Sequence, residues 1–138
     1  MALKKILIDS DICLDSITAR HPFSVYADKL LEAVEDRGLT GVVSAESFSN
    51  IYYVVRKLSS HQEAIDLLNQ LKKIVEIGNI NSEIIENALT SGWGDFEDAI
   101  QYYCAIEEDC EAIITRNTID FKAALLPVYT PGEFLNLM

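Results

Sequence analysis

Short apolar runs alternate with longer stretches of helical periodicity along the chain. The runs have the length and continuity of strands buried on both faces of a sheet, and they fall at residues 6–8, 41–43, 74–77 and 112–114. Val128-Tyr129 predicts one more short strand, at the sheet edge. Apolar residues spaced three and four apart predict the intervening helices, over residues 12–18, 23–38, 44–58, 60–72, 82–89, 95–108 and from 131 onward.

This alternation predicts a three-layer α/β/α fold around a mainly parallel sheet of four to five strands. No repeat, low-complexity run or linker interrupts the pattern, so residues 1–138 are expected to form one domain. The run at residues 6–8 is expected to be the central strand. Right-handed crossovers then bring the residues that follow each strand to one edge of the sheet, where open α/β sheets gather ligands.

Acidic residues stand at several of these positions. Asp9 and Asp11 follow the first strand, Glu46 opens the helix after the second, and Asp98 lies in the first turn of the helix that leads into the fourth. Together with the loop at residues 115–120 they are expected to converge on one cleft. Carboxylates gathered in this way repel one another unless a divalent cation neutralises them. Helix capping stays open as a simpler role for Asp9 and Asp11.

The overall charge limits the function classes. Eleven basic residues against twenty-two acidic ones give a net charge of −11. Such a surface repels polyanions, which argues against a protein that coats nucleic acid regardless of sequence. An enzyme that contacts nucleic acid briefly through a bound metal ion is compatible with the same charge.

The cysteines and the N-terminus predict a location. Cys13, Cys104 and Cys110 are odd in number and lack metal-site spacing, so reduced thiols in a cytoplasmic protein are expected. The apolar run that follows Lys4 and Lys5 is too short for a signal-peptide core or a membrane span.

The carboxylates, rather than a side-chain nucleophile, carry the predicted chemistry. Mg²⁺ and Mn²⁺ prefer oxygen ligands and are commonly held by a few carboxylates together with substrate phosphate. A bound cation lowers the pKa of its water and stabilises charge on a phosphoryl oxygen. His21 and His61 lie in polar contexts, and no Ser–His–Asp or Cys–His arrangement stands out. The residues therefore indicate metal-assisted hydrolysis of a phosphate ester.

The same motifs resemble the PIN domain, the fold of many toxin ribonucleases of bacterial toxin–antitoxin pairs. The resemblance covers essentially the whole chain. It rests on four motifs in the expected order, which are Ile8-Asp9-Ser10-Asp11, Ala45-Glu46, Asp95-Phe96-Glu97-Asp98-Ala99, and Ile114-Thr115-Arg116-Asn117 followed by Asp120-Phe121.

The resemblance implies an endoribonuclease that cleaves single-stranded RNA with Mg²⁺ or Mn²⁺ as cofactor. Asp9 and Asp98 would be the firmest metal ligands, and Glu46 a further ligand or the group that orients the attacking water. The fourth acid of the family often falls where this chain has Asn117. An amide oxygen still ligates a metal but adds no charge, which weakens the case for a second metal ion.

Two other carboxylates are candidates for the missing fourth acid. Asp120 follows Asn117 by three residues, and Asp95 precedes Asp98 by three on the same helix face. Asp95 is equally suited to cap that helix. The remaining expected neighbours of the site are Ser10, Asp11, Thr115 and Arg116, with Arg116 holding either a carboxylate or the RNA backbone.

The resemblance also implies partners. Toxin-like members of the family commonly form dimers and are held inactive by an antitoxin protein, so a homodimer and an antitoxin are expected. Tyr52 and Tyr53 are adjacent and cannot share one helix face, so one of them is expected to meet solvent or a partner subunit.

Other functions remain as alternatives. A haloacid-dehalogenase-like phosphatase would use Asp9 and Asp11 as nucleophile and acid, with residues 94–98 as its metal motif. However, the residues before Gly94 do not read as a buried strand, and the lysine that this chemistry needs is not found after one. A phosphorylated receiver domain is disfavoured for the same reason, since it too needs a lysine after a late strand. A catalytically silent PIN-like module that only binds RNA or protein is the third alternative, motivated by Asn117 and the high acidity.

Overall fold

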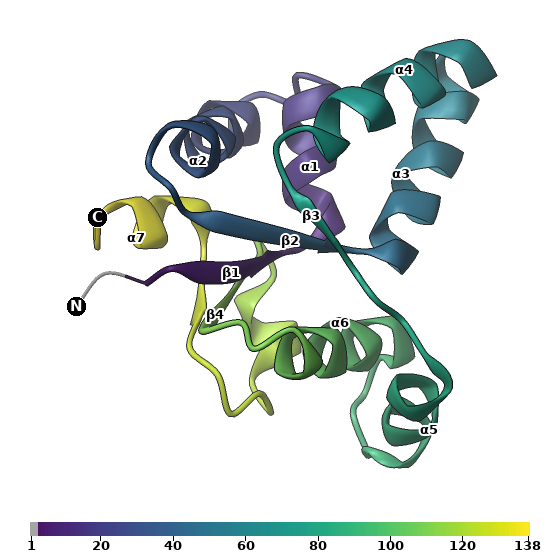
Figure 1. Ribbon diagram of the computed structural model, residues 1–138, viewed down its shortest axis with the longest axis vertical. Coiled ribbons are helices and arrows are strands. Elements are labelled where there is room, and N and C mark those ends of the chain that lie inside the picture. The colour runs from purple at the N-terminus through teal and green to yellow at the C-terminus, as the bar shows by residue number, and fades with distance from the viewer. Residues whose placement is uncertain (1–2) are drawn as a thin grey trace.

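The computed structural model describes residues 3–138, which form a five-stranded parallel sheet between layers of helices (Figure 1). The sheet order is β3-β2-β1-β4-β5, and every neighbouring pair is parallel. The central strand is β1 (Lys5–Ile8), between β2 (Thr40–Ser44) and β4 (Ala112–Ile114). The edges are β3 (Glu76–Gly78) and β5 (Val128–Tyr129). The predicted three-layer fold, parallel sheet and central first strand are therefore confirmed.

Helices cover the two faces of the sheet unequally (Figure 1). One face carries α1 (Ser10–Ile17), α2 (Phe23–Asp36), α3 (Ala45–Leu58) and α4 (His61–Lys72). The other face carries α5 (Ser82–Thr90) and α6 (Phe96–Glu107). The 3₁₀ helix η1 (Thr118–Phe121) follows β4, and the short α7 (Pro131–Leu135) packs beside α2.

The central strand joins two separate hydrophobic cores. Because successive side chains of a strand point to opposite faces, Ile6 and Ile8 enter the core under α1 to α4, whereas Leu7 enters the core under α5 and α6. All three side chains are fully buried. The continuous apolar run that predicted a doubly covered strand is explained by this arrangement.

Side-chain caps fix the helix starts that matter for the site. Ser44 Oγ accepts a hydrogen bond from the backbone N–H of Ser47 at 3.0 Å, which begins α3 directly at the end of β2. The sequence Thr130-Pro131-Gly132-Glu133 predicts a capping box, and this box is present at the start of α7. These caps allow each helix to start within one residue or two of the preceding strand.

Three details differ from the sequence prediction. The third strand begins two residues later than expected, because the backbone N–H groups of Ile74 and Val75 still bond to the carbonyl of Leu71 in the turn that ends α4. Val25 and Ile106 follow the apolar spacing that predicts core positions on their helices, but they are 42% and 44% exposed. Trp93, by contrast, follows the sequence, since a tryptophan in a turn favours a lid on the core: it packs on the aromatic cluster of the second core and stacks on Tyr102 with ring centroids 5.0 Å apart.

The three cysteines are buried and unpaired with one another, which confirms the prediction of free thiols. Within residues 3–138 no helix combines the length and apolar character needed to cross a membrane.

Candidate active site

A small cavity of about 170 Å³ opens at the carboxyl ends of β1 and β2. Its walls come from both helical layers, since α1 and α3 lie on one face of the sheet and α6 on the other (Figure 1). The lining is almost entirely polar and acidic, and consists of Asp9, Ser10, Asp11, Glu46, Ser47, Asn50, Glu97, Asp98, Gln101 and Asn117. The structure thus brings the predicted acids Asp9, Glu46 and Asp98 together in one place.

Asp9 both caps α1 and faces the cavity. Its Oδ1 accepts a hydrogen bond from the backbone N–H of Ser10 at 2.8 Å. Its Oδ2 accepts one from the hydroxyl of Thr115 at 2.9 Å, and Thr115 is fully buried at the end of β4. The capping role and the site role, which the sequence presented as alternatives, coexist in this residue.

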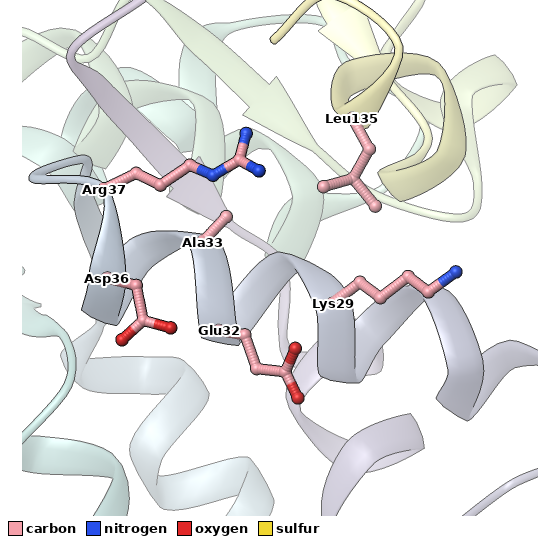
Figure 2. Close-up of a pocket in the computed structure, with 6 residues that line it drawn as sticks. All are labelled: Lys29, Glu32, Ala33, Asp36, Arg37 and Leu135. Carbon is pink, nitrogen blue, oxygen red and sulfur yellow. The ribbon is translucent and has the colours of Figure 1, made fainter.

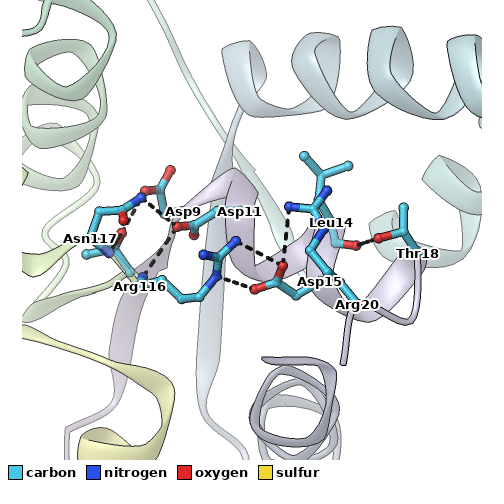
Figure 3. A network of polar contacts seen from close by, with 9 residues as sticks. Asp9, Asp11, Leu14, Asp15, Thr18, Arg20, Arg116 and Asn117 are labelled. Atoms are coloured by element: carbon cyan, nitrogen blue, oxygen red, sulfur yellow. Dashed lines mark hydrogen bonds and ion pairs between the residues drawn. The ribbon is translucent and has the colours of Figure 1, made fainter. Parts of the chain in front are cut away.

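Asp11 lies in the first turn of α1 and is bound on one side only. Its Oδ2 accepts hydrogen bonds from the backbone N–H of Arg116 at 3.4 Å and from the side-chain amide of Asn117 at 3.3 Å (Figure 3). Its Oδ1 is buried and has no hydrogen-bond partner among residues 3–138. An unpaired buried carboxylate oxygen needs a donor or a cation to offset its desolvation.

Arg116 holds a carboxylate, which resolves the two roles that the sequence left open. Its guanidinium donates to Asp15 through Nε at 2.6 Å and through Nη2 at 3.1 Å. Asp15 is fully buried in α1, and Arg20 approaches it from the other side at 3.7 Å (Figure 3). This pair fastens the segment after β4 to α1, so that residues 115–117 lie against Asp9 and Asp11.

Glu46 and Asp98 approach the cavity from opposite helical layers. Glu46 is in the first turn of α3, and Asp98 is in the first turn of α6. Both side chains are partly buried. The positive end of a helix dipole favours a carboxylate at each of these positions, which offsets part of the repulsion among them.

Burial and mutual repulsion raise the pKa of the four central carboxyls. Burial, opposed by the hydrogen bonds from Thr115 and Ser10, raises the pKa of Asp9 to about 6. Burial and then the charge of Asp9 raise the pKa of Asp11 to about 7. Since the ordinary value for both is 3.8, each group loses its charge more readily here than in water.

The other two carboxyls behave in the same way. Burial and the charges of Glu97 and Asp95 raise the pKa of Glu46 from 4.5 to about 7. Burial, followed by the charges of Asp95 and Asp120, raises the pKa of Asp98 from 3.8 to about 6. Perturbed carboxyls that share one cavity mark a functional site more often than a purely structural one.

The two candidates for a fourth acid lie outside the cavity lining. Asp95 is the N-cap of α6, where its Oδ1 accepts a hydrogen bond from the backbone N–H of Asp98 at 2.9 Å. Asp120 is exposed on η1. Both are near enough for their charges to raise the pKa of Asp98, but it is Asn117 that reaches the cavity wall.

Four lining residues were not expected at the site. Ser47 and Asn50 follow Glu46 on α3, and Asn50 donates to the hydroxyl of Ser10 at 3.2 Å. Gln101 follows Asp98 by three residues on α6. The sequence favours a solvated helix face for Glu97, which is indeed exposed and also lines the cavity. Helical spacing from Glu46 and Asp98 is the signal that would have found Asn50 and Gln101.

The donor set of the cavity fits a hydrated divalent cation better than a bare one. Among residues 3–138 no three Asp, Glu, His or Cys side chains are grouped closely enough to hold a metal ion by themselves. Mg²⁺ usually keeps several waters and takes one or two carboxylates plus substrate phosphate. The unpaired Oδ1 of Asp11 and the raised pKa of Asp9 and Asp98 are what such an ion would relieve.

A larger hollow elsewhere on the molecule lacks these properties. It has a volume of about 270 Å³ and lies between α2 and α7 (Figure 2). Its walls mix both signs of charge, from Lys29, Glu32, Asp36 and Arg37, with Ala33 and Leu135. No side chain in it is a buried, unpaired polar group among the described residues, so the acidic cavity is the candidate active site.

Comparison with known proteins agrees with this geometry. The curated relative ribonuclease VapC1 of Aquifex aeolicus is 28% identical over 142 residues, which cover 97% of this chain and 95% of that protein. A toxin–antitoxin complex from Klebsiella pneumoniae contains a chain with a TM-score of 0.69 and 26% identity, covering 91% of this chain and 97% of that one. VapC20 of Mycobacterium tuberculosis, described as a sarcin–ricin-loop-cleaving toxin, shares the fold at a TM-score of 0.63 and 12% identity, covering 78% and 86%.

The family is decided by a match along the chain. The strand that the phosphatase alternative requires before Gly94 is replaced by α5 and a turn, so that alternative is wrong. The sequence model of the PIN domain family matches residues 5–119, which include every lining residue of the acidic cavity. The chain therefore belongs to the PIN domain family.

Proposed function

We propose that the protein is a divalent-metal-dependent endoribonuclease, with single-stranded RNA as its substrate and Mg²⁺ or Mn²⁺ as its cofactor. The observation that carries the proposal is the gathering of Asp9, Glu46 and Asp98 from three different elements around one small cavity. The 28% identity to ribonuclease VapC1 over nearly the full length of both chains supports the same activity. The expected cytoplasmic location belongs to this proposal.

In this proposal Asp9 and Asp98 hold the hydrated cation, and the free oxygen of Asp11 accepts a hydrogen bond from one of its waters. A bound Mg²⁺ or Mn²⁺ would stabilise negative charge on the scissile phosphate and lower the pKa of its own water. Asp9 is held in place by Ser10 and Thr115, so its carboxylate keeps one orientation toward the cavity. Asn117 takes the position of a fourth acid with an uncharged amide, which favours a single cation.

Glu46 has the properties of a general base. Its pKa of about 7 lies near neutral pH, where proton transfer from an attacking water is most effective. The carboxylate would accept that proton on the side of the cavity opposite α6. Ser47 and Asn50, on the same wall, are placed to bind the phosphate or the water by hydrogen bonding.

The activity is tested on single-stranded RNA with a defined cation. Wild-type protein freed of metal by chelation should not cleave, and cleavage should return on addition of Mn²⁺. Glu46→Gln should retain Mn²⁺ binding but lose most of the cleavage rate, because the base is removed and the cavity keeps its shape. A saturable Mn²⁺ site in calorimetric titration would exclude the catalytically silent binding module, because such a module should show no saturable site.

The partners belong to the same proposal. Solved relatives of this fold include toxin–antitoxin complexes, among them the one from Klebsiella pneumoniae. We infer that an antitoxin protein binds this chain and that the chain itself forms a homodimer. Tyr53 on α3 is 58% exposed while Tyr52 bonds to His61 at 2.8 Å, so Tyr53 is the aromatic side chain available to a partner. Light scattering at high protein concentration tests the dimer.

A further inference from the structure

One uncharged side chain at the acidic cavity, that of Gln101, has a buried oxygen without a hydrogen-bond partner among the described residues. Gln101 lies on α6 and is only 5% exposed, yet its Oε1 has no hydrogen-bond partner among residues 3–138. A buried acceptor left unpaired destabilises a protein by roughly 1–3 kcal/mol. The residues around it on the same helix, Ile100, Tyr102 and Cys104, are buried in the apolar core, so an apolar residue would suit the position better.

The placement of Gln101 directs this acceptor to the candidate active site. It follows Asp98 by three residues, so the two side chains lie on one face of α6. Both line the acidic cavity, together with Asp9 and Glu46. The side chain that carries the unpaired oxygen therefore lines the same cavity as the carboxylates that would bind a cation.

The chemistry of a hydrated cation supplies the missing partner. Waters bound to a metal direct their lone pairs at the ion and their hydrogens outward, so they act toward the protein only as donors. The cavity has room for a few such waters at about 170 Å³. An amide oxygen accepts these hydrogen bonds without adding charge to carboxylates that already repel one another.

We propose that Gln101 is a positioning residue for the metal site, whose side-chain Oε1 accepts a hydrogen bond from a water molecule on the bound divalent cation. This inference rests on the proposed metal-dependent function and deepens it. Gln101 does not ligate the cation; it fixes one of the cation's waters against the α6 wall. Removing groups that support a metal site in this way typically weakens metal binding about 10- to 100-fold.

The test compares Gln101→Met with wild type in two measurements. Methionine keeps the unbranched length of the side chain and lacks the amide oxygen. In metal-free buffer the melting temperature should stay unchanged or rise, because an unpaired buried acceptor is removed. In calorimetric titration with Mn²⁺ the dissociation constant should rise about tenfold or more. Gln70→Met is the matched control, since Gln70 is exposed on α4 and lies outside the cavity lining.

A second variant separates a lost acceptor from a changed shape. Gln101→Glu keeps an oxygen at the same place, so Mn²⁺ binding should return to the wild-type level or exceed it. Its metal-free form should melt at a lower temperature at pH 8, because a further carboxylate joins the cluster.

The outcomes are distinguishable. If wild type and Gln101→Met bind Mn²⁺ equally, or if Gln101→Met destabilises the metal-free protein and leaves the dissociation constant unchanged, the inference about Gln101 is overturned and the proposed function stands. If wild type itself shows no saturable Mn²⁺ site, both are overturned together.

Discussion

The guanidinium of Arg116 forms a two-pronged ion pair with the fully buried carboxylate of Asp15, 101 residues away in the sequence. This contact joins α1 to the segment after β4, and both carry walls of the acidic cavity. The guanidinium also lies 4.1 Å from the ring centroid of Phe23, a cation–π contact that further fixes its position. Neither Asp15 nor Phe23 lines the cavity, so their contribution to the site is to fix its frame.

Breaking this ion pair should be costly. Arg116→Leu leaves Asp15 buried with only Arg20 nearby, at 3.7 Å and half exposed, and we expect a loss of about 3 kcal/mol in the free energy of unfolding. Urea denaturation measures it. As a control, Lys5→Met removes a pair with Glu108 that is 3.8 Å long and partly exposed, and should change stability by less than about 1 kcal/mol. Equal effects of the two substitutions would show that the buried pair has no special weight.

The metal-free protein should lose stability as the pH rises from about 5 to 8. The pKa is raised on folding to about 6 for Asp9 and Asp98, and to about 7 for Asp11 and Glu46. A carboxyl whose pKa is raised in the folded state stabilises that state fully below its ordinary pKa, and this contribution disappears as the pH passes the raised value. Thermal unfolding in the presence of chelator tests the sign.

Divalent cation should reverse this trend only at the upper end of the pH range. At pH 8 the carboxylates are charged and free to bind, so Mn²⁺ should raise the melting temperature by mass action on the folded state. At pH 5 protons occupy the same oxygens, and the increase should be small. A melting temperature of the metal-free protein that is flat or rising between pH 5 and 8 would contradict the repulsion on which both expectations rest.

Asp98 and Asp95 are close in sequence and should respond oppositely to substitution. Asp98→Asn removes a charge from the cavity, so the metal-free protein should be equally stable or slightly more so, and its response to Mn²⁺ should be largely lost. Asp95→Ala removes the cap of α6, so unfolding should become easier by about 1 kcal/mol while Mn²⁺ binding persists. Should Asp98→Asn instead cost about 1 kcal/mol and leave the metal response intact, Asp98 would be structural.

Asn117→Asp tests the uncharged position on the cavity wall. The side-chain amide of Asn117 donates to Asp11 at 3.3 Å, and a carboxylate there would replace that hydrogen bond with repulsion. We expect a lower melting temperature without metal and a smaller dissociation constant for Mn²⁺. Asp120→Asn is the companion variant: it lies outside the cavity lining, so its effect on Mn²⁺ affinity should be the weaker of the two.

The fold was predictable from the sequence because its signals are local. A run such as Ile6-Leu7-Ile8 is buried on both faces whatever its partners are, and a cap such as Ser44 acts on a residue three positions away. The third strand was misplaced because Ile74 and Val75 are as apolar as strand residues, although they belong to the turn after α4. Position 78, the last of that strand, is a glycine because a Cβ there would lie 2.7 Å from the sulfur of Cys104, a contact that the sequence does not reveal.

The site was predictable only in part. Asp9, Glu46 and Asp98 could be grouped because each lies just after a strand or at the start of a helix next to the sheet. The role of Asp15 could not be predicted, because its partner is 101 residues away and the sequence does not distinguish a buried carboxylate from an exposed one on a helix. Gln101 lies in a run of apolar residues, and its polarity together with its spacing of three from Asp98 was the available signal that it belongs to the site.

The alternation of Ile6, Leu7 and Ile8 between two cores has a consequence for how the protein opens. The two cores meet only through strands whose side chains alternate between them, as Val42 and Val43 of β2 also do, so we expect the α5–α6 layer to open as a unit while the other layer stays folded. Asp9 caps α1 in one layer, and Asp98 belongs to α6 in the other. A cation bound by both residues would link the two helical layers across the end of the sheet. Hydrogen exchange would detect this link as slower exchange of the backbone amides along α6, including amides far from the few residues that contact the ion.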